Sequence, residues 1–466
     1  MNKIIHFTAI LAVVVFSSCE KFIDVLPKGT KIPTTFSDYE ALLRDEYTSH
    51  TANVAQALNL RNDVFQTSAN LNYDKLTAAN YFWDEDADRI ALNNSGEITY
   101  YRGYAAISNA NLIINYALGA TDATSDQIQE LIAQAKVLRA FNYNQLVNYY
   151  ADTYESANAA TKLSVPLILS PDIGAPYTQV TIAALYDFML KDIEEAIPNL
   201  KATSATILHP NLGAAYPLRA RIYLEMQNYS EALAASNEAL KYNDQLYDWT
   251  AYYATYKAKI EQAGIYNINP TPMGFDYIEN YYFRHGSSAY TGRESSLRVD
   301  RASRFENGDA RFASRWKLRT VGNDSYFYSI TSGFFNVGGL TTTEVYLIKA
   351  ECQARANNVS GALTTLDLVR KKRIFTNDFN PSVATTVVEA VKLIQRTKQN
   401  ETILGIVPFA DTRRLNKDAD YKVTFTKTEN GQQKSLAPDS HLWTMPFPLG
   451  AIKNPGNGSL KQNVTK

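Results

Sequence analysis

The chain has 466 residues, a formal net charge of −1, and 20% charged residues. Proteins that bind nucleic acid or an anionic membrane surface through charge carry a basic patch, so this balance argues against both. The composition includes 31 tyrosines, which suit surfaces that are both apolar and hydrogen-bonding, or aromatic packing within a helical array. The length allows one large helical body or about two or three domains of average size.

The first eighteen residues have the pattern of a secretory signal. Lys3 is their only charged residue, residues 4–16 are almost wholly apolar, and the small residues Ser17 and Ser18 follow. Cys19 comes next, which predicts a lipoprotein signal over 1–18, with a diacylglycerol on the Cys19 thiol. The lipid would hold the protein on a membrane without a transmembrane helix. Ordinary secretion with an incidental cysteine is the alternative.

The mature chain would then keep one cysteine, Cys352, in an apolar-periodic segment where it fits as a small buried hydrophobe. Residues 19–35 predict a lipidated tether, because proline and glycine break any element there. From residue 36 the pattern becomes helical, with predicted helices over 38–44, 98–118 and 127–150. Thr181 predicts the N-cap of a further amphipathic helix.

Two helical hairpins are predicted, over 215–240 and 345–369, and both resemble tetratricopeptide repeats. Ala220 and Ala350 occupy positions where such helices cross closely, so the hairpins are interpreted as structural. About a hundred residues of a different character separate the hairpins, so this is no simple solenoid. That insert, residues 244–341, is aromatic and Gly-rich and predicts loops, short strands and short helices.

Several separated motifs occur along the chain in this order: Ser18-Cys19-Glu20-Lys21-Phe22-Ile23-Asp24 with Pro27; Tyr101, Tyr104, Ile107, Ala110 and Asn111; Ala135, Leu138-Arg139-Ala140, Tyr143, Leu146 and Tyr149; Asp309-Ala310-Arg311; Glu344, Tyr346-Leu347-Ile348 and Ala350-Glu351 with Val369-Arg370; Asp411 with Arg413-Arg414; and Pro446-Phe447-Pro448 with Asn454-Pro455. These motifs and their order are similar to those of the SusD/RagB family of surface lipoproteins. Residues 402–409 depart from the charged segment usual in the family.

The resemblance implies a mostly α-helical SusD-like domain over 36–466. Its helical scaffold would cover about 36–243 and 342–400, its loop-rich insert 244–341, and its C-terminal mixed segment 401–466. It implies a non-catalytic protein with no cofactor and no metal. The ligand would be an oligosaccharide, or as second choice a peptide, and the partner a SusC-like TonB-dependent transporter. The expected location is the cell outer membrane, lipid-anchored and facing the exterior.

The ligand is expected to stack on aromatic rings while arginine and polar groups bind its hydroxyls. The candidate residues come from the segment before the 98–118 helix and from the insert: Tyr73, Tyr81, Trp83, Tyr282, Arg284 and Tyr290. For Tyr81-Phe82-Trp83 a buried aromatic wedge is the open alternative, because apolar side chains mostly go inside.

Two other function classes stay open. A secreted glycoside hydrolase needs two nearby carboxylates, and 47 acidic residues cannot exclude such a pair. A tetratricopeptide-type scaffold that binds peptides is compatible with the hairpins. The acidic run 84–88 is interpreted as exposed acids at a helix start rather than a calcium loop, and the basic run 370–373 as a helix end facing its dipole.

Overall fold

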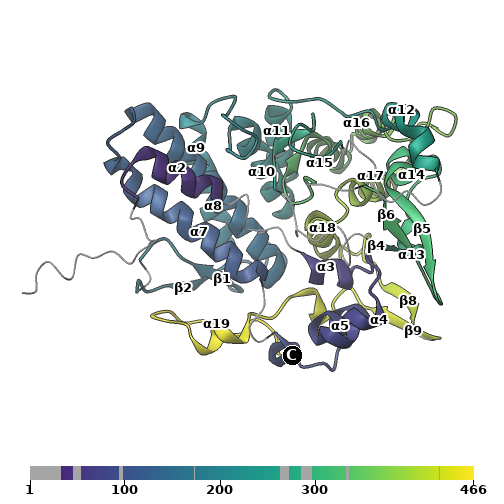
Figure 1. Cartoon of the computed structure of the whole chain (residues 1–466), viewed down its shortest axis with the longest axis horizontal. Coiled ribbons are helices and arrows are strands. Elements are labelled where there is room, and N and C mark those ends of the chain that lie inside the picture. The colour runs from purple at the N-terminus through teal and green to yellow at the C-terminus, as the bar shows by residue number, and fades with distance from the viewer. Residues whose placement is uncertain are drawn as a thin grey trace, which may run out of the picture.

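The computed structural model describes residues 33–45, 54–93, 98–172, 174–262, 272–284, 296–331, 335–429 and 431–465. Cys19, the signal, most of the tether and Tyr290 lie outside these residues. The protein is mostly helical, with short two- and three-stranded sheets at one side and along the bottom of Figure 1. No described helix is long and apolar enough to cross a membrane.

Long helices form one half of the body (Figure 1, left). They are α2 (Phe36–Asp45), α7 (Ile98–Tyr116), α8 (Ser125–Tyr150) and α9 (Ile182–Ala196), with β1 (Leu163–Leu167) and β2 (Thr178–Thr181) beside them. Thr124 and Gln127 form a capping box at the start of α8, and the predicted N-cap Thr181 accepts a hydrogen bond from the Ala184 N–H at 3.2 Å. Helix α8 is buried along nearly its whole length, so it forms the centre of this half.

Both predicted hairpins are present. They are α10 (Leu212–Glu225) with α11 (Tyr229–Ala239), and α15 (Thr342–Arg355) with α16 (Val359–Arg370), and α17 (Val387–Glu401) follows. Helix α11 packs against α15, so the two hairpins lie side by side although they are far apart in sequence. Ala220 and Ala350 are fully buried, as the close crossings require.

The two hairpin turns have the same local design. Gln227 and Asn357 have positive φ values of 60° and 62°, and the asparagine that follows each accepts a hydrogen bond from the start of the next helix. Asparagine tolerates the left-handed region better than most residues, but glutamine does not, so the turn is held by its surroundings at Gln227.

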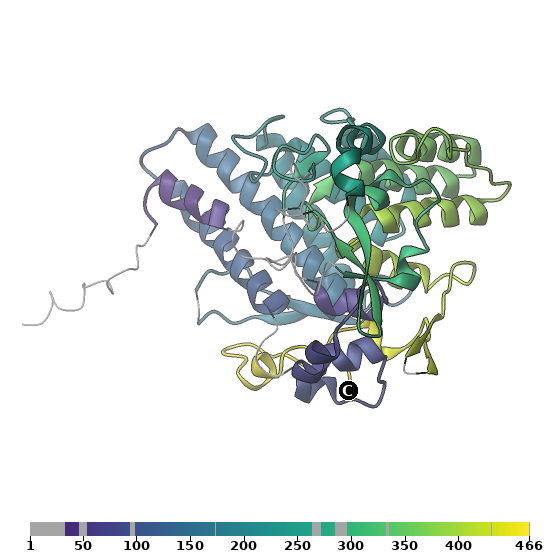
Figure 2. The same cartoon turned by 45° about the vertical axis from the view of Figure 1, so that its right-hand side comes forward.

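The insert contains the predicted mixture of short elements, although one helix is longer than expected. Its elements are α12 (Trp249–Glu261), β3 (Asn280–Tyr282), β4 (Ser296–Arg298), α13 (Val299–Ala302), α14 (Ala310–Arg315), β5 (Trp316–Val321), β6 (Asp324–Ser329) and β7 (Leu340–Thr341). Strands β4, β6 and β5 form an antiparallel sheet in that order, while β3 pairs with β7. In Figure 2 the green β5–β6 ribbon runs down toward the purple N-terminal helices and the yellow C-terminal segment.

Small elements from both ends of the chain meet at the lower right of Figure 1. They are α3 (Ala55–Leu60), α4 (Ser68–Tyr73), α5 (Lys75–Phe82) and α6 (Arg89–Leu92) from the first part, and α18 (Val407–Leu415), β8 (Phe425–Glu429) and β9 (Gln432–Leu436) from the last. This meeting place brings an N-terminal aromatic segment against the C-terminal hairpin and the sheet of the insert. The last helix, α19 (Leu449–Lys453), lies at the lower left of Figure 1 instead.

Buried ion pairs join the helices around the hairpins. Arg414 donates to both oxygens of Glu351, at 2.8 and 2.9 Å, and to Asp411 at 2.9 Å. Charged groups are costly to bury, so each one needs a partner of this kind. The basic run 370–373 was interpreted as a helix end that suits the helix dipole. It closes α16, and Arg370 and Arg373 are buried against Glu306 and Glu279.

Candidate functional site

A first hollow, which we call the hairpin pocket, lies where β8–β9 meets α5 and the sheet of the insert. Its volume is about 800 Å³. The residues that line it are Phe65, Tyr81, Arg298, Val299, Asp300, Ser303, Asn323, Asp324, Ser325, Thr426, Lys427, Thr428, Glu429 and Gln433. Three regions of the chain therefore contribute to one pocket: the N-terminal segment, the insert and the C-terminal hairpin.

The hairpin is seated on the aromatic run that the sequence singled out. The Lys427 ammonium lies 4.2 Å from the centroid of the Tyr81 ring and 4.3 Å from that of Trp83, and it donates to the Tyr81 carbonyl. Lys434, on the partner strand, lies 5.6 Å from the Phe82 ring. Cations are attracted to aromatic faces at such distances, so three consecutive rings hold two lysines of the hairpin.

Arg298 connects the pocket walls. Its guanidinium donates to the Tyr81 hydroxyl at 2.6 Å and to Asp300 at 2.9 Å, and it also pairs with Glu429. Burial raises the pKa of Tyr81 to about 12, and the nearby Arg298 only partly offsets this, so the phenol stays neutral. Burial also lowers the pKa of Lys427 to about 7, and the positive Arg298 adds to the effect.

Phe65 and Tyr326 form a stacked pair at the edge of this pocket. Their ring centroids are 4.7 Å apart and the rings are 7° from parallel, and both side chains are half-buried. The Phe65 N–H donates to the Ser296 carbonyl at 2.8 Å, which lays this segment along β4 and brings its ring to β6. Neither residue is among the candidates named from the sequence, because nothing local to residue 65 indicates pairing with β4.

Four of the predicted ligand residues are in the interior. Trp83, Tyr81, Tyr282 and Arg284 are between 0% and 5% exposed, so none presents a face for stacking on a sugar. Trp83 donates from its indole nitrogen to the Leu60 carbonyl at 2.9 Å, which confirms the buried-wedge alternative for this segment. Of the four, only Tyr81 lines the hairpin pocket.

The two predicted insert residues form a local unit. The Arg284 guanidinium lies 4.4 Å from the Tyr282 ring centroid, and Tyr282 packs edge-on against Phe141. Tyr282 ends β3, which pairs with β7, and Arg284 follows it. Tyr73 is 84% exposed at the end of α4, but it does not line the hairpin pocket.

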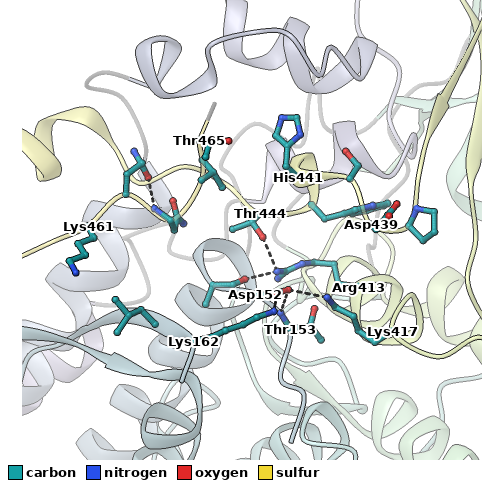
Figure 3. Close-up of a pocket in the computed structure, with 18 of the residues that line it drawn as sticks. Asp152, Thr153, Lys162, Arg413, Lys417, Asp439, His441, Thr444, Lys461 and Thr465 are labelled. Carbon is teal, nitrogen blue, oxygen red and sulfur yellow. Dashed lines mark hydrogen bonds and ion pairs between the residues drawn. The ribbon is translucent and has the colours of Figure 1, made fainter. Parts of the chain in front are cut away.

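A second hollow, which we call the basic cleft, has a volume of about 620 Å³ and lies at the end of α8 (Figure 3). Figure 3 shows Lys162 and Lys417 directed at Asp152, with Arg413 beside them. Arg413 is buried and donates to the Asn148 and Ala151 carbonyls and to Thr444.

Asp152 is unsuited to act as a proton donor near neutral pH. Burial alone would raise its pKa, but the hydrogen bond from Lys162 and the charges of Lys417 and Arg413 outweigh burial and lower the pKa to about 2. A glycoside hydrolase needs one carboxyl group whose pKa is raised. The basic cleft therefore offers no support for the hydrolase alternative at Asp152.

The acidic run before α6 acts as predicted for a helix start. Asp88 caps α6 by accepting from the Ala91 N–H at 3.0 Å, and Asp84 accepts from the Asp86 N–H at 3.1 Å. Within the described residues no cluster of three or more histidine, cysteine or acidic side chains could hold a metal ion. Cys352 is buried, as expected.

Residues 21–224 match the SusD-like family model described as starch-binding and associating with the outer membrane. The whole fold is also shared with solved structures at low identity. One is a SusD superfamily protein from Bacteroides thetaiotaomicron, with 16% identity and a TM-score of 0.72, covering 93% of this chain and 100% of that one. Another is a SusD-like carbohydrate binding protein from Bacteroides vulgatus, with 14% identity and a TM-score of 0.67, covering 93% and 100%.

A SusD superfamily protein from Bacteroides fragilis is similar at 18% identity and a TM-score of 0.65, covering 91% of this chain and 99% of that one. No curated protein matches the chain. The family model over residues 21–224 and the shared fold bear out the predicted resemblance to the SusD/RagB family, and the chain has the helical fold of these SusD superfamily structures.

Proposed function

We propose that this protein binds an oligosaccharide in the hairpin pocket and delivers it, uncleaved, to a TonB-dependent transporter in the outer membrane. The stacked pair of Phe65 and Tyr326 at the pocket edge carries the proposal. A half-buried aromatic pair offers a flat apolar face that sugar C–H groups can contact, and its stacking holds the rings in place.

The polar lining suits the hydroxyls of a neutral sugar. Asp300, Asp324 and Glu429 supply carboxylate acceptors, while Asn323 and Gln433 supply amide groups that both donate and accept. The three carboxylates outnumber the two cations, Arg298 and Lys427. An acidic sugar would meet this excess of negative charge, so a neutral glycan fits the pocket better.

The membrane anchor and the transporter partner rest on other support. The signal and Cys19 motivate lipid anchoring, and the family description motivates association with the outer membrane. Mass spectrometry of the mature membrane fraction should show a chain that begins at diacylated Cys19. A mature protein with a free Cys19 thiol would contradict the anchor.

Titration calorimetry with maltoheptaose, a starch fragment, tests the site. Phe65→Ala and Tyr326→Ala should each weaken binding about tenfold, near 1.4 kcal/mol. Tyr242→Ala is the matched control, because Tyr242 also belongs to a partly exposed stacked pair, with Tyr216, but lies outside this pocket. Equal losses in all three variants would place the site elsewhere, and release of shorter sugars during the titration would overturn the non-catalytic function.

A further inference from the structure

The basic cleft differs from the hairpin pocket in its charge. The residues that line it include four cations, Lys162, Arg413, Lys417 and Lys461, and two carboxylates, Asp152 and Asp439. The cations come from three separate stretches of the chain: the loop before β1, the end of α18 with the turn that follows it, and the C-terminal segment. Their convergence is a product of the fold rather than of a local basic run.

Two of these cations are already paired. Lys162 and Lys417 both form ion pairs with Asp152. Their ammonium nitrogens also lie 3.9 and 3.3 Å, respectively, from a carboxylate oxygen of Glu155. With Glu155 counted, four cations face three carboxylates. The pKa of Asp152 is lowered to about 2, so the cleft keeps this balance across the neutral range.

Arg413 and Lys461 are the other two cations, and the charges of Asp152 and Glu225 act on Arg413 without contacting it. Among the residues that the structure describes, no carboxylate forms an ion pair with Arg413 or Lys461. Arg413 is 4% exposed, and its guanidinium donates to the neutral oxygens of Asn148, Ala151 and Thr444. A buried guanidinium that no carboxylate contacts attracts an anion more strongly than an exposed one, because solvent screens it less.

Hydrogen bonds hold the backbone of the segment around Lys461 at the rim of the cleft. The Gln179 side chain accepts from the Lys461 N–H at 2.7 Å and donates to the Lys461 carbonyl at 3.3 Å. On the same segment, Gln462 and Asn463 bind the backbone of Phe447 and Met445. These bonds hold the Lys461 backbone beside the opening while its side chain stays exposed.

We propose that the basic cleft is a second ligand site, which takes the anionic group of an acidic saccharide, a uronate carboxylate or a sulfate ester. Lys417 and Lys461 contact the anion at the opening, and Arg413 supplies the fixed positive charge behind them. The threonine groups of the lining, Thr153 and Thr465, are placed to meet hydroxyls of the same sugar. This inference depends on the proposed function only in taking the anion to be carried on a sugar.

Titration calorimetry of the full chain with trigalacturonate, maltotriose and sodium sulfate tests the proposal. Trigalacturonate is expected to bind, and the variant with Lys417→Gln and Lys461→Gln should weaken it at least tenfold. The affinity should also fall as sodium chloride is raised from about 0.05 to about 0.5 M, because salt screens charge. The matched control carries Lys191→Gln and Lys257→Gln, two exposed lysines on other helices, and should bind like the wild type.

The outcomes separate this site from the hairpin pocket. Loss of trigalacturonate binding in Tyr326→Ala, with none in the lysine double variant, would overturn the basic cleft. Sulfate that binds as tightly as trigalacturonate would overturn the saccharide and leave a simple anion site. If the double variant melts lower than the wild type, Lys461→Gln alone decides, because that exposed side chain has no packing to lose; unchanged trigalacturonate affinity in it overturns the proposal. Maltotriose binding bears only on the hairpin pocket.

Discussion

The ammonium of Lys427 lies 4.3 Å from the centroid of the Trp83 ring, on the inner wall of the hairpin pocket. This contact gives the tryptophan a structural role that a surface platform would not have. Its indole N–H also donates a hydrogen bond to the Leu60 carbonyl, and its backbone is in the left-handed conformation, with φ at 55°. The cation above the ring, the indole hydrogen bond and the backbone conformation together hold Trp83 in place.

Replacing Trp83 should cost stability rather than glycan affinity. Trp83→Ala removes a large buried ring and should lower the free energy of unfolding by roughly 3–5 kcal/mol. Denaturant melts measure this change, and a maltoheptaose titration corrected for the folded fraction should give an affinity close to that of the wild type. Tyr73→Ala is the control, since that ring is 84% exposed and its loss should leave the melt unchanged. A wild-type melt with lost affinity would return Trp83 to the ligand site.

Lys427 should make stability depend on alkaline pH. Its pKa falls from 10.5 to about 7, first through burial and then through Arg298, so the folded chain binds fewer protons than the unfolded chain between these values. The free energy of unfolding should therefore rise with pH across this window, by up to about 1.4 kcal/mol per pH unit. Asp300, Glu429 and Lys434 also act on this amine.

Denaturant melts at pH 7, 8 and 9 check this dependence on Lys427. Lys427→Met keeps the length of the side chain but cannot titrate, so its stability should rise less steeply than that of the wild type. Lys434→Met, on the paired strand, removes only the smallest of the charge effects on Lys427, so it should change the slope less than Lys427→Met does. Identical slopes in the wild type and Lys427→Met would contradict the prediction.

Glu225 should have the opposite effect at lower pH. It is buried, and its carboxylate accepts from Asn144, Asn148 and the Tyr186 hydroxyl at 2.7–3.0 Å. Burial raises its pKa from 4.5 to about 7, against the opposing charge of Arg221. Between about pH 4.5 and 7 the folded chain thus holds a proton that the unfolded chain loses. The stabilisation that Glu225 contributes is therefore complete below about pH 4.5 and is lost as the pH rises toward 7.

Comparison of Glu225→Gln with the wild type isolates this effect. The variant keeps the size of the side chain without its titration, so the stability difference between wild type and variant should move against the wild type from pH 5 to pH 7. The shift should reach up to about 1.4 kcal/mol per pH unit. A difference that stays constant over this range would mean that Glu225 titrates near its ordinary value.

The helix crossings at the hairpins offer a test of packing. Ala220→Leu and Ala350→Leu add bulk where both alanines are fully buried, so each should lower the free energy of unfolding by about 1–3 kcal/mol. Ala254→Leu on α12 is the matched control, because Ala254 is exposed on a helix. If all three variants melt at the same temperature, the helix crossings accommodate the larger side chain and the prediction is wrong.

The helical framework could be predicted from the sequence because its signals are local. The periodicity of α8, the cap at Thr181 and the alanines of the two hairpins each act within a few residues. The site could not be predicted in the same way. Trp83 and Phe65 are both aromatic residues in short segments, and only the pairing of residue 65 with β4 and of Lys427 with Trp83 decides which ring faces the pocket.

Charge was similarly ambiguous in the sequence. Arg373 is the last residue of a basic run in the sequence. In the structure it is buried and forms ion pairs with Glu279, far before it in the chain, and with Glu401, after it. Arg413 was visible only as part of a family motif, and its place in the basic cleft depends on carbonyls at the end of α8. Long-range pairing of this kind leaves no periodic trace.

Lys427 and Lys434 face each other across β8 and β9 as a directly paired set. Like charges in that position normally weaken a hairpin, but here each side chain reaches a different ring of one aromatic run. The rim residues Thr428, Glu429 and Gln433 are separate from this attachment except for the pair of Glu429 with Arg298. The hairpin is thus an exchangeable part: a graft that keeps the two lysines and the glutamate could bring a different rim, and with it a different sugar preference, onto an unchanged scaffold.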